Sequence, residues 1–379
     1  MQLVPEPGVV VHQGVVGEGP ALYTRLLVGD PAGRNAGRLL LTWERRLSVS
    51  DPGGPTFPIL CSTDSGRTWT EIASVADAAH GVGNRYQPML YELPVAVAHL
   101  ERGDLLLAGN AIPADGSFTS LVLYSSRDGG KSWQLESVID TGGPAIYDWR
   151  SDADTTAIWE PDLRVVDGEL HCYIADERRK GDGMLQTIVR RTTRDLRSWS
   201  EPELICGIGN RYQRPGMFVA TGPLPAPGGG TRHLAVIEVV GPRDVPIHLL
   251  ESADGIDWGD PADLGRLLVA RDGVSLSGTP NLAWHDGASG PVIIATGRHS
   301  LHNGEDGNRA LVSTDLGVTW DSFELPTPAR RQHRVEGSGY SQSVRWVDDS
   351  TLVQATTLRN GAGSHDVVVT RARILDPDA

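Results

Sequence analysis

Short apolar runs alternate with segments rich in Gly, Asp and Ser along the whole chain. Residues 58–61, 121–124 and 247–250 are three of these runs. Short apolar runs bounded by turn residues are typical of β-strands, and no segment has the 3.6-residue apolar period of an amphipathic helix. The pattern therefore predicts an all-β protein.

A turn motif of the form S-x-D-x-G-x-x-W recurs between the predicted strands. Complete copies lie at 62–69, 126–133 and 313–320, and shortened copies lie at 193–199 and 252–258. Each copy follows an apolar run, so we place it in a hairpin. The Ser and Asp side chains can hydrogen-bond the turn backbone, and the Gly supplies a positive φ. We interpret the Asp and Trp residues of these turns as structural rather than catalytic.

A second series of strand starts lies upstream of the turns, with steps of 58 to 66 residues. Its members begin at Gly37, Gly103, Gly168, Arg232, Gly290 and Ser350. Each unit has room for four short strands, and six such units predict a six-bladed β-propeller. Because the repeat runs through the chain, we expect residues 1–379 to form one catalytic domain. The run Val9–His12 is expected to complete the sixth unit.

Composition narrows the possible partners. The chain has 48 acidic and 34 basic residues and a net charge of −14, which is unfavourable for binding nucleic acid or an anionic membrane surface. No apolar run approaches the length of a membrane span. The three widely spaced cysteines are expected to be free thiols, and we expect no metal or cofactor. Residues 1–7 lack the features of a signal peptide, which leaves a cytoplasmic protein or a trimmed secreted one.

Polar and aromatic residues gather where the innermost strands are predicted to start and where the strands paired with them end. In a closed propeller these positions surround the central mouth, where ligands bind. Carboxylate, guanidinium, amide and aromatic groups bind sugar hydroxyls and ring faces, so we interpret seven of these residues as substrate contacts. They are Trp43, Arg46, Asn110, Trp149, Asp176, Arg214 and Tyr340.

Two carboxylates are candidates for catalysis. Glu160 follows Trp159 at the start of a predicted innermost strand, and Glu238 interrupts an apolar strand, where burial of a charge is costly. The repeat places them on adjacent blades at the same mouth. Two carboxyl groups that flank a glycosidic bond can act as acid/base and nucleophile. Tyr340 is a third candidate, because a Tyr beside a Glu is the nucleophile of sialidases.

Four stretches resemble a known family. The turns resemble the Asp-boxes of sialidase-like propellers. Residues 87–94, 159–161 with 172–177, 214–217 and 237–238 are similar in order and spacing to glycoside hydrolase family 93, the exo-α-1,5-L-arabinanases. The resemblance implies a six-bladed propeller that releases arabinobiose from the non-reducing end of arabinan with retention, and its two catalytic glutamates match Glu160 and Glu238. A longer loop at 223–230 departs from the family pattern and is expected to change the cleft.

Two alternatives stay open at this point. An exo-α-sialidase would need three Arg to hold the substrate carboxylate, whereas Asp176 stands at a position where sialidases carry one of them, and an Asp there would repel that carboxylate. A non-catalytic carbohydrate-binding propeller would not need two convergent carboxylates. For the enzyme we expect a monomer that binds an oligosaccharide or a polysaccharide such as arabinan.

Overall fold

The computed structural model describes residues 1–17, 19–45, 54–146, 155–210, 212–288, 290–327 and 338–375. These residues form an all-β structure with almost no helix, as the sequence predicts. Its single described helical segment is a 3₁₀ turn, η1 (Lys180–Asp182). Within these ranges, no helix is long and apolar enough to cross a membrane.

The strands of each main sheet follow one another in the sequence and pair antiparallel. The first of these sheets contains β3 (Ala21–Val28), β4 (Leu39–Arg45), β5 (Phe57–Ser62) and β6 (Thr70–Val75). The second contains β7 (Asn84–Glu92), β8 (Leu105–Ala111), β9 (Thr119–Ser126) and β10 (Gln134–Gly142). The third contains β11 (Ile158–Val166), β12 (Glu169–Asp176), β13 (Thr187–Thr193) and β14 (Glu203–Gly207).

The second half of the chain continues this arrangement. The fourth sheet contains β15 (Arg214–Pro225), β16 (Thr231–Val240), β17 (Ile247–Ser252) and β18 (Arg266–Leu267). The fifth contains β20 (Asn281–Gly287), β21 (Gly290–Thr296), β24 (Arg309–Ser313) and β25 (Asp321–Glu324). A small sheet beside it contains β19 (Ser275–Ser277), β22 (His299–His302) and β23 (Glu305–Gly307).

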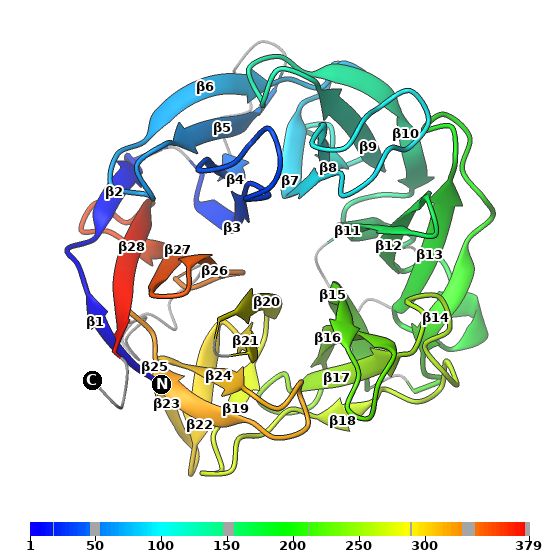
Figure 1. Cartoon of the computed structure of the whole chain (residues 1–379). Coiled ribbons are helices and arrows are strands. Elements are labelled where there is room, and N and C mark those ends of the chain that lie inside the picture. The colour runs from blue at the N-terminus through cyan, green and yellow to red at the C-terminus, as the bar shows by residue number, and fades with distance from the viewer. Residues whose placement is uncertain are drawn as a thin grey trace.

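The last sheet joins the two ends of the chain. It contains β26 (Ser343–Asp348), β27 (Thr351–Arg359) and β28 (His365–Leu375), together with β1 (Gln2–Pro5) and β2 (Val9–His12). Both N-terminal strands pair with β28, which confirms the prediction for Val9–His12. Figure 1 shows the sheets arranged around a common centre, with β3, β7, β11, β15, β20 and β26 nearest to it.

Apolar side chains fill the space between adjacent sheets. Between the third and fourth sheets, the Tyr173 ring stacks on Phe218 with 4.2 Å between ring centroids, and Trp258 packs edge-on against both rings. The Trp258 indole N–H donates to the Tyr173 hydroxyl oxygen at 3.1 Å. This contact fixes the two sheets that carry Glu160 and Glu238 relative to each other.

The Asp-containing turns have the structural role that the sequence predicts. In the first copy, the Asp64 carboxylate accepts hydrogen bonds from the Thr68 N–H and hydroxyl, and the Ser62 hydroxyl oxygen accepts the Gly66 N–H. The Trp69 indole N–H donates to the Gly66 carbonyl oxygen at 3.1 Å. The hydrogen bonds from Thr68 hold the pKa of Asp64 below its ordinary value. The turn therefore satisfies its own polar groups and leaves none for catalysis.

The structure also describes the three cysteines and the 223–230 loop. All three cysteines are free, as predicted. The loop forms the end of the β15–β16 hairpin, with the Ala226 N–H bonded to the Gly230 carbonyl oxygen. Because β15 starts at Arg214 in the candidate site and runs to Pro225, the loop lies at the opposite end of the strand. The expected change of the cleft is therefore not found among the described lining residues.

Candidate active site

A cavity of about 340 Å³ lies where the innermost strands start. Its described lining contains four carboxyl and two guanidinium groups: Glu44, Glu160, Glu177, Glu238, Arg214 and Arg298. Aromatic rings complete the wall: Tyr86, Trp159, His299 and Tyr340. A cavity that combines convergent polar groups with aromatic faces is suited to a small polar ligand such as a sugar.

One residue at the start of each innermost strand has a left-handed backbone. These residues are Tyr23, Gln87, Glu160, Met217, Thr279 and Ser341, with φ between 42° and 61°. At four of them the pairing with the next strand is irregular. Positive φ is uncommon for residues other than glycine, and bulges of this kind re-aim the backbone. The same conformation therefore recurs in six successive inner segments of the described chain.

The N–H group of each of these residues donates to an acceptor in the preceding inner segment or in the strand paired with it. The Gln87 N–H donates to Glu44 Oε1 at 3.1 Å, and the Glu160 N–H donates to Gln87 Oε1 at 3.0 Å. The Met217 N–H donates to Glu160 Oε2 at 2.7 Å, and the Thr279 N–H donates to Glu238 Oε2 at 2.6 Å. Three of the cavity carboxylates are thus held by the backbone of the next sheet.

Glu160 and Glu238 come from neighbouring sheets and meet beside Gly216. The Cα atoms of Gly216 and Glu238 are partners in the β15–β16 ladder. A Cβ atom placed on Gly216 would lie 3.3 Å from Glu160 Oε2. The absence of a side chain at Gly216 therefore lets the Glu160 carboxyl group lie against the strand that is paired with Glu238.

Burial raises the pKa of both carboxyl groups of this pair. Burial, followed by the charge of Glu238, raises the pKa of Glu160 from 4.5 to about 8. Burial also raises the pKa of Glu238, opposed by the hydrogen bond from the Thr279 N–H and by the charges of Arg214 and Arg298. A buried carboxyl group that stays protonated near neutral pH can act as a general acid.

Glu177 anchors the cationic side of the cavity. Its Oε1 atom accepts the Trp159 indole N–H at 3.0 Å and an Arg214 guanidinium N–H at 2.6 Å. Its Oε2 atom accepts a hydrogen bond from Lys180 Nζ at 2.8 Å. Burial raises the pKa of Glu177, but the charges and hydrogen bonds of Arg214 and Lys180 outweigh it and lower that pKa. We call Glu177, Trp159, Lys180 and Arg214 the Glu177 cluster.

Four of the nine site residues predicted from the sequence line the cavity. They are Glu160, Glu238, Arg214 and Tyr340. The Arg298 guanidinium lies over the Tyr340 ring, 5.8 Å from its centroid. Arg46 and Trp149 lie outside the residues that the structure describes.

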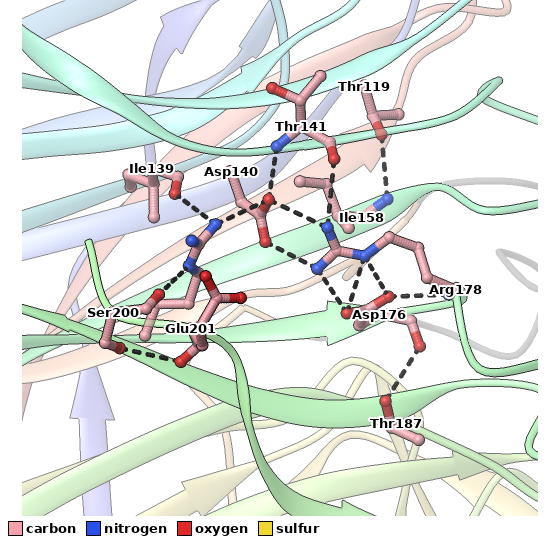
Figure 2. A network of polar contacts seen from close by, with 11 residues as sticks. Thr119, Ile139, Asp140, Thr141, Ile158, Asp176, Arg178, Thr187, Ser200 and Glu201 are labelled. Carbon is pink, nitrogen blue, oxygen red and sulfur yellow. Dashed lines mark hydrogen bonds and ion pairs between the residues drawn. The ribbon is translucent and has the colours of Figure 1, made fainter. Parts of the chain in front are cut away.

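Three other predicted contacts lie away from the described lining of the cavity. Asp176 is buried and pairs with Arg178, whose guanidinium also binds Asp140 of the neighbouring sheet (Figure 2). Trp43 is buried in the apolar cluster of the first sheet, with its ring 5.5 Å from that of His12. The Asn110 amide donates to the Ile158 carbonyl oxygen and accepts the Ser120 N–H, so it joins the second and third sheets.

The reason for two of these differences is the alternation of side chains along a strand. Asp176 immediately precedes Glu177, and Trp43 immediately precedes Glu44. Because successive side chains point to opposite faces of a sheet, an error of one residue selects the wrong face. Glu44, Gln87, Glu177, Arg298 and His299 line the cavity without having been predicted as site residues. For Glu44, an acidic residue directly after the last apolar residue of its strand would have been the signal, whereas the same rule selects Asp176 rather than Glu177.

The fold and this carboxylate-lined cavity define the class: an all-β protein similar to the sialidase-like propellers. No protein-family model matches the sequence, and no curated protein matches it. Solved structures do match. The glycoside hydrolase family 93 α-L-arabinofuranosidase of Fusarium graminearum, solved with arabinobiose, is 26% identical, with a TM-score of 0.80 over 97% of this chain and 98% of that protein.

Two further structures show the range of the similarity. The α-L-arabinanase of Penicillium chrysogenum, also solved with arabinobiose, is 29% identical, with a TM-score of 0.78 over 97% of this chain and 98% of its own. A mutant sialidase of Trypanosoma rangeli is 12% identical, with a TM-score of 0.52 over 96% of this chain and 58% of its own, and shares the fold alone. The predicted resemblance to family 93 is thereby confirmed, and these structures support a glycoside hydrolase activity.

Proposed function

We propose that this protein is a retaining exo-α-1,5-L-arabinanase that releases arabinobiose from the non-reducing end of arabinan. The observation that carries the proposal is the presence of Glu160 and Glu238, from adjacent sheets, in the wall of one cavity. The high structural similarity to an α-L-arabinofuranosidase and an α-L-arabinanase, both solved with arabinobiose, supports the choice of substrate.

In the proposed mechanism, Glu160 is the acid/base and Glu238 is the nucleophile. Glu160 is protonated near neutral pH because burial raises its pKa to about 8, so it can donate a proton to the leaving glycosidic oxygen. The Glu238 carboxylate attacks the anomeric carbon and forms a covalent glycosyl–enzyme. Glu160, now ionised, then removes a proton from the water that releases the sugar, and the configuration is retained.

The charges of the cavity favour a neutral sugar. Four carboxyl groups face two guanidinium groups among the described lining residues, and one of these guanidinium groups, Arg214, is already paired with Glu177. A sialic acid carboxylate would be repelled by this arrangement. We assign Arg214 and Tyr340 to substrate binding, where they can contact hydroxyl groups and a ring face.

The proposal includes the architecture of the enzyme. We propose that the six main sheets are the blades of one closed six-bladed propeller, with β1 and β2 completing the last blade. Residues 1–379 then act as one catalytic domain, and the enzyme works as a monomer. Size-exclusion chromatography with light scattering tests the monomeric state.

The activity is tested with linear α-1,5-arabinan beside an α-sialoside. We expect the wild-type protein to release arabinobiose, Glu238→Gln and Glu160→Gln to lose at least about a thousandfold in kcat, and the sialoside to stay intact. Glu71→Gln is the matched control, because Glu71 is exposed on the outer strand β6. Cleavage of the sialoside, together with loss of activity in Tyr340→Phe, would establish the sialidase alternative.

A structure with a bound arabinobiose analogue tests the mechanism separately. Retention requires carboxyl groups about 5–5.5 Å apart, because the nucleophile must reach the anomeric carbon directly. A separation above about 6.5 Å would leave room for a water molecule and would indicate inversion instead.

A further inference from the structure

Lysine is rare in this protein, and one of its two lysines is buried at the site. Lys131 and Lys180 are the only lysines beside 32 arginines. Lys131 is exposed in an Asp-containing turn. The Lys180 side chain is 6% exposed and lies against the Glu177 carboxylate, whose side chain is 2% exposed. A buried ammonium group is costly unless it is paired, so this position needs an explanation.

The charges of the Glu177 cluster alternate in sign from Lys180 toward the proposed catalytic pair. The Lys180 ammonium contacts Glu177 Oε2, Glu177 Oε1 contacts the Arg214 guanidinium, and the Arg214 charge acts on both Glu160 and Glu238. Lys180 itself is absent from the described lining of the cavity, so it acts through Glu177 rather than on the substrate.

Two contacts fix the segment that carries Glu177 and Lys180. The Glu177 N–H donates to the Ala157 carbonyl oxygen at 3.0 Å. Arg178 lies between Asp176 and Asp140 and ties the segment to the neighbouring sheet at 2.7 Å to each carboxylate (Figure 2). The 3₁₀ turn η1 then starts at Lys180. The backbone that places the Lys180 ammonium group beside Glu177 is therefore itself held in place.

We propose that Lys180 is a positioning residue that, through Glu177, holds the Arg214 guanidinium beside Glu160 and Glu238. This inference rests on the proposed catalytic roles of those two carboxyl groups. With Lys180, the three charged groups of the Glu177 cluster have a net charge of +1. Without it, their net charge is zero, and Glu177 neutralises Arg214 more completely.

The sign of the effect follows from these charges. Loss of the Lys180 charge destabilises the ionised form of both carboxyl groups, so the pKa of Glu160 and that of Glu238 rise. The acidic and the basic limb of the pH profile of kcat/KM then both move to higher pH. Loss of the Glu177 charge has the opposite effect in Glu177→Gln. The Gln amide oxygen can still accept the Arg214 hydrogen bond, so two cations are left near the pair and both limbs move to lower pH. A purely structural role would lower activity in both variants without moving the limbs in opposite directions.

The experiment compares pH profiles of kcat/KM on α-1,5-arabinan for Lys180→Met, Lys180→Arg and Glu177→Gln. On the acidic side we expect about a tenfold loss in Lys180→Met, the size expected of one charge in a partly buried cluster. Lys180→Arg keeps the charge and should restore the wild-type limbs. Lys131→Met removes the same charge from an exposed turn and should change kcat/KM less than twofold.

A measurement without substrate separates this inference from the proposed function. Protein labelled with ¹³C at the Glu side-chain carboxyl is titrated by NMR, with Glu160→Gln and Glu238→Gln used to assign the two signals. We expect their titration midpoints to rise in Lys180→Met, to return in Lys180→Arg and to fall in Glu177→Gln. If the wild type cleaves no arabinan but the midpoints move in this way, the proposed substrate fails and the positioning role stands. Unchanged midpoints in folded Lys180→Met, or no rescue by Lys180→Arg, would overturn the role of Lys180.

Discussion

Glu160 is expected to make the stability of the folded protein depend on pH, because its pKa is raised in the folded state. Its folded-state pKa of about 8 lies above the ordinary 4.5. The folded protein therefore holds this proton more tightly than the unfolded chain. The resulting contribution to stability is fully present below pH 4.5 and is lost as pH rises toward 8. Glu160→Gln does not titrate, so it should lose nothing over this range.

The size of the effect follows from the linkage between proton binding and unfolding. Across this interval the wild type loses up to about 1.4 kcal/mol per pH unit relative to Glu160→Gln. Between pH 5 and pH 7 the free energy of unfolding of Glu160→Gln should thus gain at most about 2.7 kcal/mol on that of the wild type.

Urea denaturation at pH 5, 6, 7 and 8 measures this difference. The exposed Glu71→Gln variant is the control and should show no trend with pH. The account requires the advantage of Glu160→Gln to grow with pH. An advantage that is constant from pH 5 to pH 8, or that shrinks, would refute the claim that burial raises the pKa of Glu160.

Three further predictions concern residues around and away from the pair. Arg214→Met removes a cation that lowers the pKa of both proposed catalytic carboxyl groups, so the acidic limb of kcat/KM should move to higher pH, and an unmoved limb would contradict the assignment. Gly216→Ala places a Cβ 2.4 Å from Gln186 Nε2 and 3.3 Å from Glu160 Oε2, so kcat/KM on arabinan should fall about tenfold while circular dichroism stays unchanged. Asp64→Ala leaves the donors of its turn without their acceptor, and urea denaturation should show a loss of about 1–2 kcal/mol at unchanged kcat/KM; a matching loss of activity would place this turn in the site.

The strands and turns could be predicted because their signals are local. The Ser62–Trp69 turn forms its hydrogen bonds within eight residues, so the motif alone specifies its geometry. The pairing of Val9–His12 with the last sheet was also predictable, because the last repeat lacked its turn motif and one strand-like run was left over at the N-terminus.

The candidate site was predicted less completely, because its geometry depends on register. Glu160 and Glu238 stood out as carboxylates in apolar surroundings, and both line the cavity. Choosing Asp176 instead of Glu177 selected the opposite face of the strand, where Arg178 pairs with it. The left-handed residues carry no shared sequence signal, since none of the six is a glycine. Their conformation is imposed by the hydrogen bonds between sheets, which the sequence does not display.

The stereochemistry of the first product tests the central claim most directly. Linear α-1,5-arabinan is incubated with the enzyme, and ¹H NMR follows the anomeric signals of the released sugar before mutarotation. Arabinobiose that appears first as the α-anomer, and only in protein with an intact Glu238, is the result that the two-carboxylate mechanism predicts. Initial release of the β-anomer, or equal release by Glu238→Gln, would contradict it.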